Sequence, residues 1–293
     1  MNLSLTGKFN LVLLLIFSIG FAVTAYISNA LLLQNAREEV MQDARILMES
    51  ALASRAYTIK HVKPLLETQM KYQMIPESVP SYAATESLAA VRAKFPEYTY
   101  KEATLNPTNP RDRAAGWEVD VVQALRNNAD LPEVVGDRED VGGAAIYIAR
   151  PLKIKDAACL VCHSTVDVAP KTLVDAYGPN NGFGWNFQET VGAQIVTVPQ
   201  SLALKRAHSA LVTFLASLFG VFVMIFITFN VMLRFIITKP VLRLAKFADS
   251  VSMGHLEEED IPVKGTDEIS QLTEAFKRMR NSTVSALKML EGD

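Results

Sequence analysis

Residues 9–33 read FNLVLLLIFSIGFAVTAYISNALLL and contain no charged side chain. A second uncharged stretch, residues 209–233, reads SALVTFLASLFGVFVMIFITFNVML. As a helix, a stretch of about 25 residues is roughly 37 Å long and exceeds the hydrocarbon core of a bilayer, which is roughly 30 Å thick. We therefore predict two transmembrane helices. The apolar part of the first is too long for a cleaved signal sequence, so we expect it to remain as an anchor.

The composition of the 293 residues agrees with a membrane protein. Hydrophobic residues make up 49% of the chain and the mean hydropathy is +0.16, which excludes a mainly disordered protein. There are 29 lysines and arginines against 31 aspartates and glutamates, a net charge of −2. This balance excludes nucleic-acid binding through a dominant basic field. Two cysteines are too few for a disulfide framework.

The basic residues predict the orientation in the membrane. Before Asp249, the second stretch is followed by four basic residues and no acidic one: Arg234, Lys239, Arg243 and Lys246. Because cytoplasmic flanks carry the excess of Lys and Arg, we place residues 1–8 and 234–293 in the cytoplasm. Residues 34–208 then lie outside, which for a bacterial inner membrane means the periplasm.

The external segment 34–208 combines helical and strand-like stretches. Residues 35–74 favour helix with an interruption at Pro64, and further helices are expected at 82–94 and 116–127. Two β-branched stretches bounded by Gly or Pro predict strands at 143–152 and 191–198. Helices first and strands last are typical of an α+β domain.

Between the two predicted strands, Cys159, Cys162 and His163 form a C-x-x-C-H motif. Two thiols three positions apart reach the two vinyl groups on one edge of a haem and become thioethers, and the histidine becomes the proximal ligand of the iron. A thioredoxin-type motif would need a βαβ context, and a zinc site would need four ligands. The motif therefore predicts one covalent haem c on Cys159 and Cys162, with His163 on the iron.

Other residues of the segment are candidates for haem contacts. His61 is the candidate for the opposite axial position, with Met70, Met74 or an open position as alternatives. Arg55 and Arg113 are candidates for the propionates, because a guanidinium matches a carboxylate bidentately; the alternative is two surface charges. Glycines of the loop after residue 176 permit a close approach to the macrocycle, and three aromatic residues are packing candidates: Tyr57, Tyr100 and Trp185.

Five stretches carry a resemblance to a known family: residues 54–67, 98–118, 147–152, 159–163 and 176–199. The second includes the run NPTNP, and the last reads AYGPNNGFGWNFQETVGAQIVTVP. Together they resemble the PAS-like c-type haem domain family, which is found in membrane sensors and some cyanobacterial haem proteins. The resemblance implies a short antiparallel sheet with flanking helices. The fold class expected for the whole chain is α+β, a PAS-like haem domain anchored between two membrane helices.

The C-terminal segment has two short amphipathic helices. Apolar residues recur at spacings of 3, 4 and 3 in each: Val241, Leu244, Ala248 and Val251, then Ile269, Leu272, Phe276 and Met279. With Pro240 at the start, Gly254 and Leu256 in the connector and Asp267-Glu268 opening the second helix, the segment resembles the HAMP linker domain of bacterial receptors. The resemblance implies a helical module, and two chains would close a parallel four-helix bundle and form a homodimer.

These features predict a membrane-bound sensor. A redox change or a diatomic gas at the haem would be signalled through the HAMP domain to a separate cytoplasmic protein, because no kinase or cyclase region follows the second helix in this sequence. The alternative is a membrane-anchored c-type cytochrome that exchanges electrons with a redox partner. The sequence contains no recognisable acid–base constellation beside the motif, so we do not expect an enzyme. The expected surroundings are membrane lipid, and nucleic acid is not an expected partner.

Overall fold

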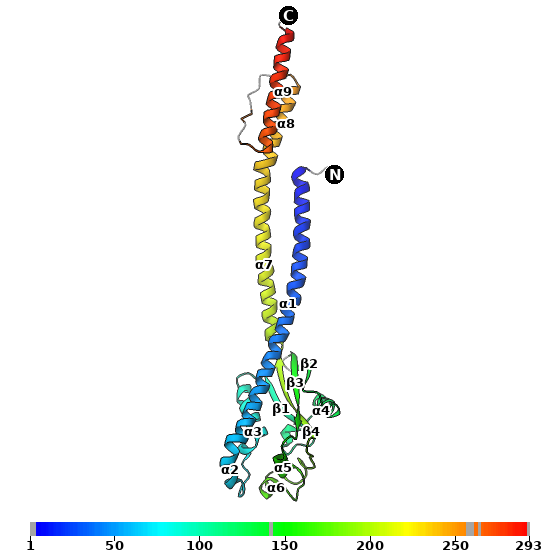
Figure 1. Cartoon of the computed structure of the whole chain (residues 1–293), viewed down its shortest axis with the longest axis vertical. Helices are drawn as coiled ribbons and strands as arrows, with labels where there is room; N and C mark the ends of the chain where they lie inside the picture. The colour runs from blue at the N-terminus through cyan, green and yellow to red at the C-terminus, as the bar shows by residue number, and fades with distance from the viewer. Residues whose placement is uncertain (1–3, 141–142, 256–260, 263–264, 292–293) are drawn as a thin grey trace. The chain divides into compact units, whose positions relative to one another are not determined.

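The computed structural model describes residues 4–140, 143–255, 261–262 and 265–291 (Figure 1). The chain divides into two compact units, Asn29–Ala210 and Met1–Ser28 together with Leu211–Asp293. Two long helices, α1 (Leu5–Tyr57) and α7 (Ser201–Met232), have residues in both units. Each unit is described by itself below.

A four-stranded antiparallel sheet forms the centre of the Asn29–Ala210 unit, with the strands in the order β1-β4-β3-β2 (Figure 1). Its strands are β1 (Thr99–Thr104), β2 (Val134–Asp140), β3 (Gly143–Lys153) and β4 (Thr190–Pro199). β4 is buried along its whole length because it lies between two neighbours and under helices on both faces. The α+β class expected from the sequence is confirmed.

Helix α1 packs against one face of this sheet through one residue in every turn. Ala36, Val40, Ala44 and Met48 are buried and recur at intervals of four, so they lie in one row along the helix. Their partners are β-branched residues of β3 and β4: Ile146, Ile148, Val196 and Val198. Two alanines of α7 complete this core, Ala203 and Ala207. Small residues on the helices allow a close approach to the bulky side chains of the sheet.

Helix α4 (Trp117–Asn127) covers the opposite face, with Val121, Val122 and Leu125 buried. The sheet meets it mainly with small residues, Ala103, Ala149 and Ala193, and with Ile195. Residues on this face alternate with those facing α1, as the pleat of a sheet requires.

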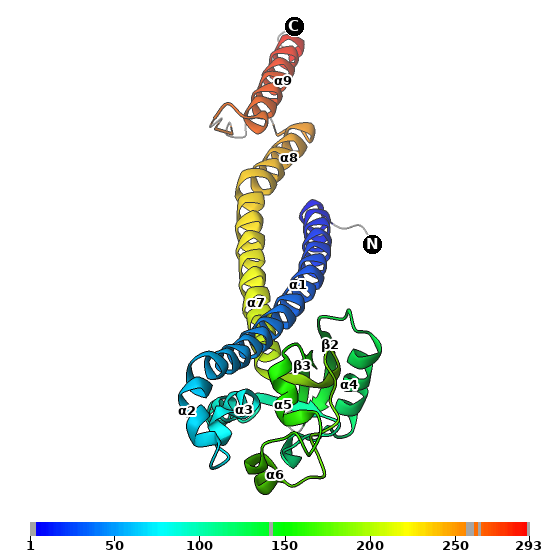
Figure 2. The same ribbon diagram turned by 60° about the horizontal axis from the view of Figure 1, so that its bottom comes forward.

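Short helices surround the end of the unit that carries the C-x-x-C-H motif (Figure 2). They are α2 (Lys63–Met70), α3 (Pro80–Arg92), α5 (Leu160–His163) and α6 (Lys171–Tyr177). Ala84 and Leu88 of α3 pack against Ala51 of α1. The hydroxyl of Thr172 in α6 donates to the main-chain oxygen of Met70 at the end of α2 (3.3 Å).

The interruption expected at Pro64 takes the form of a π-helical segment. α1 ends at Tyr57, the π segment covers Thr58–Val62, and Pro64 lies in the first turn of α2. A proline is tolerated there because the first amides of a helix have no partner within it. The predicted strands correspond to β3 and β4, whereas β1 and β2 were not predicted.

The other unit contains the apolar parts of α1 and α7. Two helical stretches, within Leu5–Met70 and Ser201–Ser252, are long and apolar enough to cross a membrane. The amide of Asn10 donates to the side-chain oxygen of Asn230 (2.9 Å), and the rings of Phe17 and Phe222 stack at 4.6 Å. In lipid, such interhelical polar pairs and close packing hold membrane helices together.

Beyond α7 the chain continues through a π segment (Leu233–Thr238) into α8 (Lys239–Ser252) and, after a connector, α9 (Glu268–Glu291). Leu244 and Phe247 of α8 are buried, and the side chain of Asp267 caps α9 by accepting from the amide of Ser270 (2.8 Å). Leu256, one of the connector residues named above, lies outside the described residues. Phe247 was not part of the predicted apolar stripe.

Candidate haem site

The two cysteines lie on one short helical turn. Residues Ala157–Cys159 form a 3₁₀ turn that runs directly into α5. The carboxylate of Asp156 starts this turn by accepting from the amide of Ala158 (2.8 Å). Residues three positions apart on a helix share a face, so Cys159 and Cys162 point to the same side. Both thiols are free and half-buried.

His163 is held in one orientation by its surroundings. Its Nδ1 lies 2.7 Å from the main-chain oxygen of Gly182, which can only accept, so Nδ1 carries the proton and donates it. The ring stacks on Trp185 with 4.0 Å between the ring centroids and 15° between the planes. Burial lowers the pKa of His163, which keeps the imidazole neutral. Nε2, the remaining nitrogen, therefore has a lone pair available for a metal.

The carbonyl of Gly182 is positioned by two asparagine contacts and by the glycine itself. Asn106 accepts from the amide of Gly182 (3.3 Å) and donates to the main-chain oxygen of Phe183 (3.2 Å). Gly182 has φ +84°, and a Cβ there would come within 2.0 Å of the hydroxyl oxygen of Thr108. The NPTNP run and the glycine-rich loop thus form one structure that supports His163.

These residues fit a haem. A histidine that donates Nδ1–H to a carbonyl and keeps Nε2 free is the usual arrangement of a metal-binding imidazole. The two cysteines precede it on the same turn and face one side. Burial raises the pKa of both thiols, which is the opposite of what an activated redox thiolate requires.

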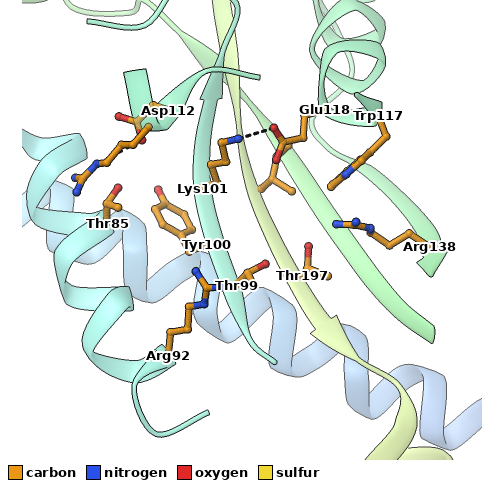
Figure 3. A pocket seen from close by; sticks show the side chains of 12 residues that line it. Thr85, Arg92, Thr99, Tyr100, Lys101, Asp112, Trp117, Glu118, Arg138 and Thr197 are labelled. Carbon is orange, nitrogen blue, oxygen red and sulfur yellow. Dashed lines mark hydrogen bonds and ion pairs between the residues drawn. The ribbon is translucent and has the colours of Figure 1, made fainter. Parts of the chain in front are cut away.

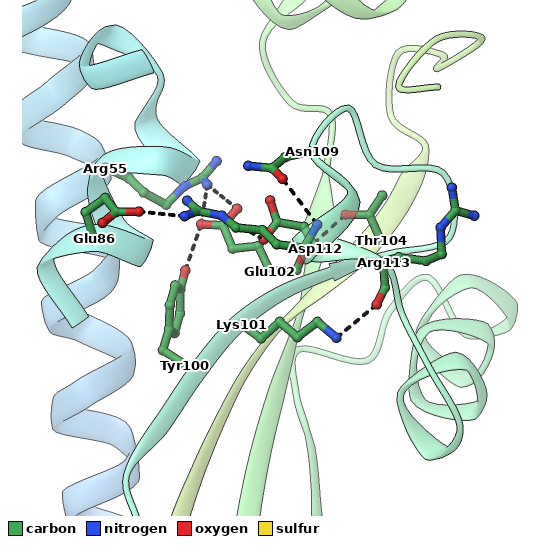
Figure 4. A network of polar contacts seen from close by, with 10 residues as sticks. Arg55, Glu86, Tyr100, Lys101, Glu102, Thr104, Asn109, Asp112 and Arg113 are labelled. Atoms are coloured by element: carbon green, nitrogen blue, oxygen red, sulfur yellow. Dashed lines mark hydrogen bonds and ion pairs between the residues drawn. The ribbon is translucent and has the colours of Figure 1, made fainter. Parts of the chain in front are cut away.

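A buried polar network lies between the end of α1 and the sheet (Figure 4). A guanidinium nitrogen of Arg55 lies 2.6 Å from the carboxylate of Glu102, whose side chain is 2% exposed. The hydroxyl of Tyr100 donates to the same carboxylate (2.7 Å) and accepts from Gln194 (3.3 Å). The charge of Arg55 also opposes the burial-driven rise in the pKa of Cys159, so the network lies near the motif.

The other residues singled out from the sequence lie at different places in this unit. His61 belongs to the π segment, is exposed and has its ring 5.2 Å from that of Tyr57. Met70 and Met74 are half-buried. Arg55 binds Glu102, and Arg113 donates to the side-chain oxygen of Asn181 (3.2 Å). The axial role of His61 and the propionate roles of Arg55 and Arg113 stay predictions.

Sequence reasoning did not find three residues that organise the site: Glu102, Thr108 and Gln194. Glu102 and Gln194 are ordinary polar residues with no motif of their own, and Thr108 lies in the NPTNP run but was not itself singled out. No sequence signal pointed to Glu102, because β1, the strand that carries it, was itself not predicted.

The unit has a four-stranded antiparallel sheet with a haem-type C-x-x-C-H turn at one end, and the chain has two helices able to cross a membrane. These features together define a membrane-anchored haem-protein architecture. The Tll0287-like family matches residues 33–199, more than half of the chain, and the chain belongs to this haem-protein family. A HAMP domain matches residues 229–284. Both resemblances noted in the sequence are thereby confirmed.

Among solved structures, the crystal structure of the cyanobacterial haem protein Tll0287 is similar to this chain. It has 16% sequence identity and a TM-score of 0.44, and the match covers 55% of this chain and 96% of that one. A search among curated proteins found no match.

Proposed function

We propose that this protein is a membrane-bound sensor whose Asn29–Ala210 unit carries one covalent haem c in the periplasm. The haem-protein family and the HAMP domain together support a signalling role. The observation that carries the proposal is the course of α1. This single helix begins at Leu5 in the apolar segment and ends at Tyr57, two residues after Arg55, whose charge acts on Cys159. A change at the motif therefore acts on a helix that also enters the membrane.

In this proposal Cys159 and Cys162 form the thioethers and Nε2 of His163 binds the iron. The carbonyl of Gly182 keeps the proton on Nδ1, and Trp185 fixes the plane of the ring. When bound, the haem supplies an iron centre that can change its oxidation state or take a diatomic gas. Arg55 transmits the difference to α1 by shifting its contact with Glu102.

The orientation in the membrane is part of the proposal. The excess of basic residues after the second span supports cytoplasmic ends. We place the protein in the inner membrane, with the HAMP domain in the cytoplasm as a homodimer that acts on a separate signalling protein. The absence of an acid–base constellation in the sequence supports a protein that is not an enzyme.

A membrane-anchored electron carrier is the second candidate function. The observation in its favour is the exposure of the motif, because both cysteines are only half-buried and Val161 between them is 55% exposed. A haem attached there would have an edge close to the surface, where a redox partner could approach.

The first test asks whether haem is attached. Haem staining on a denaturing gel is expected to label the wild-type protein and to fail for Cys159→Ala/Cys162→Ala. A phosphatase fused near residue 130 should be active, and one fused after Asp293 should be silent. A stain that persists in the double variant contradicts the attachment, and the reverse fusion pattern contradicts the orientation.

The second test separates the sensor from the carrier. With Cys159 and Cys162 held as thioethers, a cysteine introduced as Leu272→Cys is the one free thiol of the chain. A bismaleimide, which forms thioether links that a reductant does not cleave, then cross-links two chains in native membranes. A sensor predicts different cross-linking rates with haem oxidised, reduced, or reduced with CO or NO. Equal rates in all these states support the electron carrier.

A further inference from the structure

A pocket of about 360 Å³ lies on the α4 face of the sheet (Figure 3). It does not include the cysteines or His163 of the haem motif. Strand alternation and register explain its floor, since Thr99 pairs with Thr197 and Lys101 pairs with Ile195 on this face. The apolar residues of α4 cover the part of this face around Ala103, Ala149 and Ala193. The neighbouring part, where the pocket lies, has hydroxyls and charges in place of an apolar core.

The pocket is rich in cationic side chains. Four basic residues and two acidic ones line it: Arg92, Lys101, Arg111, Arg138, Asp112 and Glu118. Lys101 binds Glu118 (2.6 Å), and Arg111 binds Glu86, which does not line the pocket (2.5 Å). Arg92 makes no ion pair or side-chain hydrogen bond within the part of the chain that the structure describes. Its charge is available for a bound anion.

The cations are arranged on two sides of the pocket. Figure 3 shows Arg92 reaching in from α3 and Arg138 from β2, with Thr99 and Thr197 on the strands between them. The guanidinium of Arg138 lies over the ring of Trp117, 4.4 Å from its centroid, which fixes its position. An anionic group at each end of a short ligand would meet one arginine.

We propose that this pocket is a second ligand site, separate from the haem motif, which binds a small organic dicarboxylate between Arg92 and Arg138. Its volume lies at the lower end of the range of roughly 300–1,000 Å³ found for small-molecule sites. The threonine hydroxyls supply further hydrogen bonds to the carboxylates or to a hydroxyl of the ligand. The proposal extends the function above, because the same unit would then respond to a soluble metabolite as well as to its haem.

Titration calorimetry on the full-length protein in detergent, at constant ionic strength, tests this site with succinate, glutarate, succinamide and phosphate. We expect the two dicarboxylates to bind and neutral succinamide to give no heat. Arg92→Gln and Arg138→Gln should each weaken binding about tenfold or more, because each removes a charge-assisted contact. Arg92 is exposed, so its variant should fold normally.

Lys94→Gln is the matched control. Lys94 lies two residues beyond α3, is exposed and does not line the pocket, so the variant removes the same charge without changing the site. The proposal is overturned if neither dicarboxylate binds at concentrations up to about 10 mM. It is also overturned if succinamide binds as tightly as succinate, or if phosphate binds more tightly than the dicarboxylates. A loss of affinity in Lys94→Gln equal to that in the arginine variants contradicts it as well. The haem stain and absorption spectrum, recorded on the same samples, report on the haem proposal independently.

Discussion

At the scale of single residues, the orientation of His163 depends on a glycine nineteen positions away. Gly182 has a positive φ and no room for a Cβ beside Thr108. Its carbonyl is the acceptor that fixes the proton on Nδ1. In the proposed haem site, the motif would supply the three groups that face the haem, and the glycine-rich loop holds His163 in its orientation.

Gly182→Ala should displace this carbonyl. The added Cβ conflicts with both the backbone conformation and Thr108, so we expect a loss of about 1–3 kcal/mol of folding free energy. The haem absorption bands should also shift as the imidazole loses its acceptor. The control is Gly178→Ala, which has a similar φ of +81° but nothing within 4 Å of the new Cβ. Equal spectra for both variants would show that the carbonyl does not control His163.

The pair formed by Arg55 and Glu102 should be costly to break. Arg55→Met leaves the carboxylate of Glu102, 2% exposed, without its cation, and we expect a loss of about 3–5 kcal/mol in urea unfolding. Arg55→Met/Glu102→Met should recover much of that loss. Arg37→Met is the surface control, because its pair with Asp137 is about half exposed and should contribute about 1 kcal/mol or less.

Asp112 gives a pH dependence. Burial raises its pKa to about 6, and the nearby charge of Arg111 only partly offsets this. The folded state thus holds the proton more tightly than the unfolded chain, so this contribution to stability is lost as pH rises from about 4 to about 6. Asp112→Asn has no such loss. Its melting temperature should exceed that of the wild type at pH 7, and the difference should shrink toward pH 4; a constant difference contradicts the assignment.

At the scale of helices and strands, the sequence predicted the elements that have a clear apolar pattern. The β-branched runs of β3 and β4 and the helices α3 and α4 were expected close to their observed bounds. β1 was not predicted because polar residues such as Lys101 and Glu102 are typical of loops. Their oppositely charged partners, which allow them to lie in a covered strand, are visible only in the structure. β2 ends in a charged run and lies at the edge of the sheet, where neither face needs to be fully apolar.

The candidate site likewise contains residues that the sequence predicts and residues that it does not. Cys159, Cys162 and His163 are recognisable because haem chemistry fixes their spacing. Thr108 and Gln194 are not, because their roles arise only when segments far apart in sequence meet. Phe247 was missed because a spacing of 3, 4 and 3 selects Leu244 and Ala248 and passes over Phe247, one of the three residues between them.

The pair of Asn10 and Asn230 makes a prediction about the two membrane helices. Asn10→Leu leaves the side-chain oxygen of Asn230 without its interhelical donor in lipid, which should cost about 1 kcal/mol of helix association. Cysteines introduced on the two helices in an Asn10→Leu background should therefore cross-link more slowly in membranes. Ser18→Leu is the control, because Ser18 is exposed and makes no side-chain hydrogen bond among the described residues. Equal slowing by both substitutions would show that the amide pair is not responsible.

At the scale of the whole molecule, the exposed apolar residues of the HAMP helices argue for association of two chains. Val241, Leu272 and Met279, members of the predicted stripes, are 36%, 44% and 53% exposed in the single chain. Leu244 is already buried in the single chain. The residues left exposed are those that a second copy would cover in a four-helix bundle.

We therefore expect Leu272→Cys to form a disulfide between two chains in native membranes. Adding Phe276→Asp should reduce this product severalfold, because a carboxylate would enter an apolar seam without a partner. Glu274→Cys, on the exposed side of α9, is the position that should not cross-link. A chain that stays monomeric at every stripe position contradicts the dimer and removes the transmission element of the sensor.

The two π segments have a consequence for how motion could pass along this chain. A π turn contains about one more residue than an α turn, so tightening it into an α turn moves the register by one residue. In an α-helix one residue corresponds to about 100° of rotation and 1.5 Å of rise. Thr58–Val62 follows α1, and Leu233–Thr238 precedes α8. Conversion of either segment into α-helix would therefore turn the helix on one side against the helix on the other in a discrete step.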